Sequence, residues 1–581
     1  MVPCPTVRNI LKAATFTATL TWRHLRAEPA RMPLLALRLL PGGVRGRVRA
    51  TAGRLGTLPQ AYALWDAGRR DATLRAIRDA ATTATPGSLA RMTAFALAIE
   101  EPVLAEELLD RLPEGPRRTR LAHRLDVTTG RAVPADTSVD LPEHRHDIKV
   151  TPRQKTRRDD TMNAGRSATD DLRVLHVVTN ALPHTNAGYT QRTHRIALGQ
   201  RAAGLDPHVV TRLGYPLTKG VPDARPRVDV DGVPYHRLLP WIAPGDDARA
   251  LRAGLRRAAP LVERLRPRVL HAASNHLNAR LALGLRERYG LPVVYEVRGF
   301  LEESWLSRDP SRSVNDAYYR AERARETACM EAADLVVTLG ETMRADIVAR
   351  GIVPERVVVV PNAVDEAFLD PLPDGADLRR ELGIGPEDFV AGTTTSCYGY
   401  EGLDTLVDAV AELRRREVPA HLLIVGDGPE LGALRERAAA AGLGEAAHFP
   451  GRVPAEAVRR HHAVLDVFAV PRRDARVSRL VTPLKPVEAM AGGLPVVASD
   501  VEALREIVEP GMTGELIPPD DSEGLADALE KLAYSRETRE EFGLAGRQRV
   551  GNARTWRAAA YRYIESYEAV IRKVSEPGHG L

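Results

Sequence analysis

From Leu172 onward, short runs of β-branched residues alternate with longer stretches of helical periodicity, and this alternation limits the possible folds more than any other feature. Six runs lie before Asn362, at 172–179, 207–211, 267–273, 292–297, 334–339 and 356–361. Five more follow, at 388–394, 420–426, 446–451, 465–471 and 494–499. Continuous apolar strands separated by helices are typical of a parallel sheet covered on both faces. The chain is therefore predicted to be α/β, with two open sheets in tandem over 172–361 and 362–551.

The first part of the chain differs from these two domains. Residues 1–130 show helical periodicity alone, and their helix lengths and small residues resemble tetratricopeptide-type arrays, although no repeat aligns. Residues 131–171 contain few apolar side chains and predict a disordered linker. A solvated tether is a simpler explanation of His144 and His146 in this linker than a metal site.

The end of the chain predicts a long helix over residues 552–573. Its apolar and aromatic positions on one face are Trp556, Tyr563, Tyr567 and Val570. Such a face needs burial, so residues 552–581 are expected to form a helix that crosses back onto the first sheet domain, followed by a tail. Domain closure would then hinge near Asn362 and this helix. Because open α/β sheets bind ligands beyond the carboxyl ends of their strands, two facing sheets predict a binding cleft between them.

The composition favours a cytoplasmic protein without a structural metal. The three cysteines, Cys4, Cys329 and Cys397, lie far apart and lack metal-ligand spacing, as is usual in a reducing compartment. No run reaches the roughly 20 apolar residues that cross a bilayer. The N-terminus also lacks the uninterrupted apolar stretch of a signal peptide.

Positive charge is concentrated at the N-terminus. Residues 1–50 contain nine Lys and Arg residues and a single acid, Glu28, in a chain of net charge +6. Two interpretations fit this distribution. In the first, a basic amphipathic segment over 9–40 lies on an anionic membrane surface, at the inner face of the plasma membrane. In the second, the arginines form a solvated face of a helical domain. Nucleic acid is not expected as a partner, because the basic run has no interleaved aromatic platform and no recognition motif.

A loop in the first sheet domain has the chemistry of an anion site. The loop after the first predicted strand ends at Gly188, which opens a helix. A glycine there lets the backbone approach a ligand, and the helix start offers unpaired amides. A tight strand-to-helix turn explains the same glycine without any ligand.

A turn in the second domain is a stronger anion-site candidate, because two prolines precede a helix that is predicted to start near Pro486. The amides of Leu484 and Lys485 would face the cleft, and the Lys485 side chain adds a full positive charge. The Glu488 carboxylate can accept hydrogen bonds from two vicinal ribose hydroxyls. Glu488 is also explained as a first-turn acid that favours the helix dipole.

Five segments together resemble family 4 of the glycosyltransferases. They are RVVVVPNAVD (356–365), LLIVGDGPE (422–430), FPGRV (449–453), PLKPVEAMAGGLPVVASD (483–500) and EIVEPGMTGELIPPDD (506–521). The resemblance covers 172–574 and implies the GT-B fold, two facing Rossmann-like domains, here with an N-terminal all-helical extension. YEVRGF (295–300), YGYEGLDTL (398–406) and VTPLKPVEAM (481–490) are most similar to a subgroup associated with exopolysaccharide assembly.

The resemblance implies a reaction and a set of partners. The enzyme would move a hexose-type sugar from a nucleotide diphosphate donor to a glycan or lipid-linked acceptor, with retention of configuration, in polysaccharide or cell-envelope glycan synthesis. It would use no metal and no cofactor besides the nucleotide-sugar donor. Catalysis in such a reaction consists of positioning and charge stabilisation.

Single residues receive roles from the same resemblance. Glu488 matches the family glutamate that holds the donor ribose, and Gly188 matches the glycine loop that faces the diphosphate. Gly426 and the segment that ends at Val453 match the wall of the nucleobase pocket. Glu506 matches a second acid near the donor.

The sequence departs from the family pattern at residues that usually bind phosphate or sugar. Leu480 stands eight positions before Glu488, where the family has a glutamate. Ser396 and Glu401 stand where the family has an arginine and a lysine that bind the diphosphate. Arg298 stands where a catalytic histidine is frequent, and an arginine cannot act as a base at neutral pH.

Other cations are expected to replace the missing ones, because charge that develops on a diphosphate leaving group must be neutralised. Lys485 and Arg298 are predicted to act catalytically on the diphosphate together with Glu488 on the ribose. Arg472 and Arg479 are predicted to contribute to donor binding.

Two alternatives to a transferase remain open on the sequence. The chain is a catalytically silent scaffold that binds nucleotide sugar in a glycan assembly complex, as the lost Arg, Lys and Glu would suggest. Alternatively, it is an epimerase or a phosphorylase on the same fold, although no cofactor lysine is found for the latter.

Overall fold

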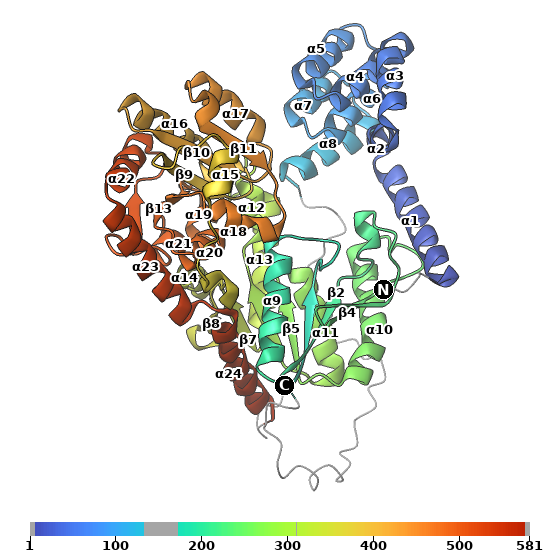
Figure 1. The fold of residues 1–581 in the computed structure, drawn as a ribbon. Helices are drawn as coiled ribbons and strands as arrows, with labels where there is room; N and C mark the ends of the chain where they lie inside the picture. Colours follow the sequence, from blue (N-terminus) through green and yellow to red (C-terminus); the bar gives the residue numbers. More distant parts are fainter. Residues whose placement is uncertain (1–5, 133–171, 310, 576–581) are drawn as a thin grey trace.

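The computed structural model describes residues 6–132, 172–309 and 311–575, which form two sheet domains and a helical domain (Figure 1). The predicted linker, 131–171, lies outside these residues from position 133 onward, and so do His144 and His146. The described part confirms the α/β class, the two tandem sheets and the N-terminal helical region.

The first sheet has eight strands in the order β3-β4-β2-β1-β5-β6-β7-β8. The six strands that the apolar runs predict are β1 (Arg173–Val178), β2 (Asp206–Thr211), β5 (Val269–Ala273), β6 (Val293–Val297), β7 (Leu335–Thr338) and β8 (Val357–Val359), all parallel. One face packs on α10 (Asp247–Leu265), α11 (His276–Tyr289) and α13 (Ala317–Ala332). The other face packs on α9 (Gly188–Ala202) and α24 (Trp556–Ser575). Burial on both faces explains why these strands are mainly apolar.

Two further strands of this sheet were not predicted. β3 (Arg227–Val230) and β4 (Val233–Arg237) form an antiparallel hairpin at one edge, and β4 runs parallel to β2. All five residues of β4 are buried although its sequence, VPYHR, contains a proline and two basic residues. His236 lies 3.0 Å from Nδ1 of His208, and Arg237 pairs with Asp223 at 2.9 Å. These partners lie outside the strand, so its own sequence does not reveal its burial.

The second sheet is wholly parallel, with six strands in the order β11-β10-β9-β12-β13-β14. They are β9 (Phe389–Thr394), β10 (Ala420–Val425), β11 (Ala447–Gly451), β12 (Val467–Val470), β13 (Val496–Ser499) and β14 (Gly514–Ile517). The helices around them include α16 (Leu403–Arg415), α17 (Leu431–Ala440), α20 (Lys485–Ala491), α22 (Ser522–Tyr534) and α23 (Arg536–Ala553). β14 was not predicted, because only two of its four residues are buried.

The helical domain contains α1 (Val7–Ala27), α2 (Met32–Leu39), α3 (Gly42–Ala52), α4 (Thr57–Asp66), α5 (Arg70–Ala81), α6 (Pro86–Ala98), α7 (Pro102–Asp110) and α8 (Pro116–Thr129). Leu34 and Leu37 pack in the core of this domain, whereas Trp22 of α1 is exposed. Ala13 and Phe16 of α1 pack instead against the first sheet domain. Across the described ranges, no helix has both the length and the apolar content that a bilayer crossing requires.

The helix α24 crosses from the second domain back onto the first, as predicted (Figure 1). Trp556, Tyr563, Tyr567 and Val570 are all buried there, in a cluster that includes Leu172. The Tyr567 hydroxyl accepts a hydrogen bond of 2.9 Å from the Gln200 side chain in α9. The first domain is therefore completed by a segment that follows the second one in the chain.

A buried charged cluster lies where the two connections between the domains meet. The Glu296 carboxylate pairs with Arg192 at 2.7 Å and accepts a hydrogen bond of 2.7 Å from the Tyr563 hydroxyl. Arg192 also donates to the carbonyl of Val360 and to the Asn362 side chain, in the connection between the sheets. Burial acts to raise the pKa of Glu296, but the guanidinium groups of Arg298 and Arg192 hold this pKa well below its usual value. One arginine thus joins α9, the connection and α24.

Candidate functional site

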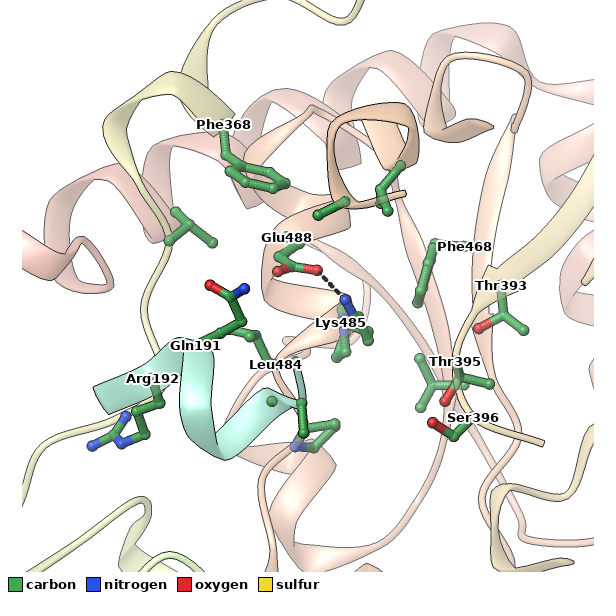
Figure 2. A pocket seen from close by; sticks show the side chains of 18 of the residues that line it. Gln191, Arg192, Phe368, Thr393, Thr395, Ser396, Phe468, Leu484, Lys485 and Glu488 are labelled. Carbon is green, nitrogen blue, oxygen red and sulfur yellow. Dashed lines mark hydrogen bonds and ion pairs between the residues drawn. The ribbon is translucent and has the colours of Figure 1, made fainter. Parts of the chain in front are cut away.

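A cleft of about 1200 Å³ separates the two sheet domains. The first domain contributes Asn186, Gly188 and Gln191 from the loop after β1 and the start of α9. The second contributes the ends of β9 and β12 and the turn before α20, and Figure 2 shows side chains from both sides. The site therefore lies beyond the carboxyl ends of the strands, as expected for facing open sheets.

Lys485 and Glu488 lie at the start of α20 and line this cleft. The Lys485 Nζ lies 2.9 Å from the Glu488 carboxylate, and the two side chains point toward one another in Figure 2. The Glu488 side chain is 13% exposed and that of Lys485 is 41% exposed. α20 begins at Lys485, one residue before the predicted start, with Pro486 in its first turn. The pair places one positive and one negative group side by side at the wall of the cleft.

The first domain faces this pair with polar groups from α9. The Gln191 side chain points toward Glu488 across the cleft in Figure 2. Gly188 also lines the cleft, and a Cβ atom at this position would meet nothing within 4 Å. The glycine thus leaves open space at the surface of the cleft, where the backbone is accessible to a ligand.

The ends of two strands of the second sheet form another wall of the cleft. Thr393 lies at the end of β9, Thr395 directly follows this strand, and Phe468 comes from β12 (Figure 2). Tyr398 and Tyr400 also line the cleft, and their rings stack with centroids 5.9 Å apart and planes inclined by 5°. A flat aromatic surface of this kind can pack against a planar ring or a sugar face.

Arg472 lines the cleft, but its charge is already paired. Its guanidinium donates hydrogen bonds of 3.1 and 3.0 Å to the two carboxylate oxygens of Glu401. Both residues are buried. Glu401 therefore neutralises the arginine that was expected to replace a missing cation.

The structure places four of the predicted site residues outside the cleft lining: Arg298, Arg479, Glu506 and Gly426. Arg298 is absent from the described cleft lining, because its guanidinium is held by Glu296 at 2.6 Å and by the Tyr189 carbonyl at 2.8 Å. Arg479, also outside the lining, is exposed and ion-paired with Asp474.

Glu506 is the third of these residues, and it contacts the first domain instead of the cleft. Its carboxylate accepts hydrogen bonds from the backbone amides of Glu341 and Thr342, at 2.9 and 2.8 Å. These amides begin α14 (Glu341–Ala349), whose unpaired N–H groups the carboxylate satisfies. Glu506 thus joins the two domains as a helix cap.

The two predicted residues of the base pocket differ in position. Val453 lines the cleft, whereas Gly426 lies just after β10 and is not among the described lining residues. Gly426 has a φ of 151°, and a Cβ atom there would collide with the Thr395 carbonyl oxygen. Its role is therefore to let two strand ends approach closely. Leu484 lies in the lining with Lys485, as predicted.

Four arginines in the cleft, Arg192, Arg195, Arg452 and Arg459, were not predicted. Arg195 pairs with Asp365 at 2.9 Å, and Arg459 donates to the backbone carbonyls of Asp370 and Pro371. Arg452 donates a hydrogen bond of 3.2 Å to the carbonyl of Asn186, across the cleft. Arg452 stands in the segment FPGRV, so its position after a strand was the available signal. In the described part of the chain, no cluster of three or more His, Cys, Asp or Glu residues could hold a metal ion.

Comparison with known proteins gives matches in both sheet domains. Residues 187–363 match the family model "Glycosyl transferase 4-like domain", and residues 389–534 match "Glycosyl transferases group 1". Over 209 residues the chain is 34% identical to a GDP-mannose-dependent alpha-(1-6)-phosphatidylinositol monomannoside mannosyltransferase of Mycolicibacterium smegmatis, which covers 36% of this chain and 54% of that protein. The chain thus spans about half the length of this relative.

A longer match has lower identity. The D-inositol 3-phosphate glycosyltransferase of Nocardia farcinica is 28% identical over 426 residues, which are 69% of this chain and 89% of that protein. Two solved structures share the fold. Sucrose-phosphate synthase from Thermosynechococcus elongatus has a TM-score of 0.56 at 20% identity, covering 69% of this chain and all of that one. Anabaena Alr3699/HepE in complex with UDP has a TM-score of 0.52 at 18% identity, and the match covers 68% of this chain and 100% of that one.

Proposed function

We propose that this chain transfers a hexose-type sugar from a nucleotide diphosphate donor to a glycan or lipid-linked acceptor. The premise is that its two sheet domains are those of a family 4 glycosyltransferase with the GT-B fold. The observation that supports it best is the Lys485–Glu488 pair at the wall of the interdomain cleft. A nucleotide diphosphate sugar offers a diphosphate and a ribose diol, which match a cation and a carboxylate side by side.

Donor binding would exchange the partners of this pair. The Glu488 carboxylate accepts hydrogen bonds from the two ribose hydroxyls, and the Lys485 ammonium turns to the diphosphate. The stacked Tyr398 and Tyr400 offer an aromatic surface to the rest of the donor. Each group of the donor then has a counterpart in the second domain.

The leaving diphosphate needs positive charge in addition to Lys485. Two further arginines line the cleft: Arg195 of α9, on the first-domain side, and Arg452 of the second domain, which reaches across the cleft to Asn186. Their present partners are a backbone carbonyl and an aspartate, so closure around a donor can redirect them. We propose a retaining, metal-independent transfer, in which the acceptor hydroxyl attacks from the face that the diphosphate leaves.

The relatives guide the choice of acceptor. Their names refer to phosphatidylinositol mannosides and to inositol 3-phosphate, so we favour a glycan or lipid of the cell envelope over an exopolysaccharide as the product. The mannosyltransferase from Mycolicibacterium smegmatis uses GDP-mannose by name, and the Anabaena protein was solved with UDP. GDP and UDP sugars are therefore the first donors to test.

Incubation of the full chain with GDP and UDP sugars tests the proposal. Slow release of nucleoside diphosphate that is strongly reduced in Lys485→Ala and in Glu488→Gln would support it, and the anomeric configuration of an isolated product would test retention. Release that does not depend on either residue would exclude this site.

One observation favours a second candidate, a silent scaffold that binds nucleotide sugar. Glu401 neutralises Arg472 in the cleft, and Glu401 stands where the family has a lysine. A scaffold would bind nucleoside diphosphate, with thermal stabilisation that depends on Glu488, but would neither hydrolyse nor transfer the sugar.

A membrane surface is the proposed environment of the acceptor reaction. Trp241 and Ile242 are exposed on the loop beside α1, and the Lys12 Nζ lies 5.7 Å from the Trp241 ring centroid. Burial, with the nearby charges of Arg257 and Arg8, lowers the pKa of Lys12. The basic N-terminal segment and this loop thus gather cations around an aromatic tip, which suits anionic lipid.

A further inference from the structure

A second cavity, of about 230 Å³, lies between α1 and the first sheet domain. It is separate from the donor cleft, and α1 lies outside both regions that match the family models. The large apolar side chains that line it are Phe16, Leu20, Leu213, Leu251, Leu277 and Leu281. One wall of the cavity is therefore formed by a helix that lies outside the two sheet domains.

The position of α1 at this cavity is fixed by several contacts. Phe16 is buried against Leu217 and Leu239. Its ring also lies close to Gly214, where a Cβ atom would stand 2.8 Å from the Phe16 Cζ atom. The Arg23 guanidinium donates to the Pro244 carbonyl at 2.6 Å. The cavity thus has a defined wall on the side of α1.

Arg212 brings a positive charge into this apolar setting. It follows β2 directly, lines the cavity and is partly buried. Within the described residues, its guanidinium makes no hydrogen bond and no ion pair within 4 Å. Burial lowers the pKa of Arg212, and the Asp247 carboxylate acts in the opposite direction. A partly desolvated guanidinium without a partner is costly, and an anionic ligand would remove that cost.

The cavity opens on the same edge of the first sheet as the donor cleft. Arg212 follows β2, and Leu277 lies in the first turn of the helix after β5. The Arg212 backbone amide donates to the carbonyl of Val178, the last residue of β1, at 2.8 Å, and the loop after that strand leads to Gly188, which lines the cleft. A group held at Arg212 would therefore lie beside the start of α9, on the first-domain side of the reaction site.

We infer that this cavity binds an amphiphilic anion, a phosphate or carboxylate attached to an apolar chain, with its acidic group at Arg212 and its chain along Phe16 and Leu20 of α1. Two acids, Asp246 and Asp247, also line the cavity. Asp246 is bound to the Arg249 amide at 2.6 Å, so its carboxylate already has a partner. The apolar lining distinguishes this site from one for inorganic phosphate, and Arg212 distinguishes it from one for a neutral lipid.

The role of the ligand as acceptor rests on the proposed transferase function, whereas its binding does not. In that role the anionic amphiphile is the acceptor substrate, and α1 recognises its apolar part while the second domain holds the donor.

Titration calorimetry on the full chain, without donor, tests the binding. The probes are mono-n-octyl phosphate, inorganic phosphate and octyl glucoside, used below micelle-forming concentrations. Octyl phosphate is expected to bind at least about tenfold more tightly than either of the others, since both the charge and the chain are recognised. Equal affinity for octyl phosphate and inorganic phosphate, or for octyl phosphate and octyl glucoside, would overturn the inference.

Two variants and a matched control locate the site. Arg212→Leu and Leu20→Asp are each expected to lower the affinity for octyl phosphate about tenfold, whereas Arg320→Leu, which removes an exposed arginine of α13, leaves it unchanged. Arg212→Leu is also expected to keep or raise the melting temperature, because it removes an unpaired charge. Octyl phosphate binding that is unaffected in both cavity variants would refute the site.

Nucleoside diphosphate binding, measured on the same variants, separates this inference from the proposed function. It should be unchanged in Arg212→Leu. If octyl phosphate binds as expected while donor turnover is absent, the site stands and only its role as an acceptor site falls.

Discussion

The substitution Glu488→Gln tests the donor site with little change in shape. The glutamate carboxylate offers two acceptor oxygens, whereas the amide offers one acceptor and one donor group. In the proposed complex both oxygens accept hydrogen bonds from ribose hydroxyls. A hydrogen bond to a charged group contributes roughly 1.5–3 kcal/mol and a neutral one about 1 kcal/mol, so the variant should lose about 1–3 kcal/mol of donor binding. This loss corresponds to about a 5- to 150-fold lower kcat/KM.

The stability of the variant should change much less. The Lys485–Glu488 pair joins residues three positions apart, and Lys485 is 41% exposed, so the pair contributes about 0–1 kcal/mol to folding. The melting temperature should therefore fall by at most about 4 °C.

Nucleoside diphosphate affinity, sugar transfer and melting temperature are measured together for wild type, Glu488→Gln and a control, Glu509→Gln. Glu509 is a half-exposed glutamate of the same domain that pairs with Arg549. Donor affinity and turnover in Glu488→Gln that match those of the control would refute the assignment of the ribose to Glu488.

Three further predictions address the rest of the molecule. Glu296→Gln leaves the Arg192 and Arg298 guanidinium groups buried without their carboxylate, so urea unfolding should show a loss of about 3–5 kcal/mol, and an unchanged midpoint would contradict this account. The Arg45 hydrogen bond, against the effect of burial, lowers the pKa of Asp66 from 3.8 to about 2. A depressed carboxyl pKa stabilises the fold above the unfolded value, and the effect is lost as the pH falls through the folded value. The stability deficit of Asp66→Asn, followed by circular dichroism, should therefore shrink between about pH 4 and pH 2, and a constant deficit would exclude this linkage. Ile242→Asp should reduce co-sedimentation with anionic vesicles but not change that with neutral ones, and wild-type pelleting would argue against the membrane face.

The strands that were predicted are those whose own residues show their burial. β1 and β6 are mainly apolar and rich in valine, because both faces of the first sheet are covered. β4 has a proline, a histidine and an arginine, and its burial depends on His208 and Asp223, which no local pattern indicates. Sequence periodicity therefore finds the centre of such a sheet more readily than its edge.

The same limit applies to the site. The position of Lys485 and Glu488 at the cleft could be predicted because a proline turn and a helix start fix their neighbourhood within a few residues. Arg298 was assigned to the diphosphate as a free cation, but Glu296, two residues earlier, holds it. Arg472 was assigned in the same way, and its partner, Glu401, stands 71 positions away. A sequence shows that an arginine is charged, but it does not show which carboxylate forms an ion pair with it.

The crossing of α24 has a consequence for the order in which the molecule can assemble during synthesis. The first sheet leaves the ribosome early, but Tyr563 and Tyr567, which cover one of its faces and contact Glu296 and Gln200, are made only after the whole second domain. Until then the nascent first domain exposes the surface that Trp556 and its neighbours later cover. The first domain therefore cannot be completed until the second domain has been made. A chain that is interrupted before residue 556 would lack the helix that covers the first sheet.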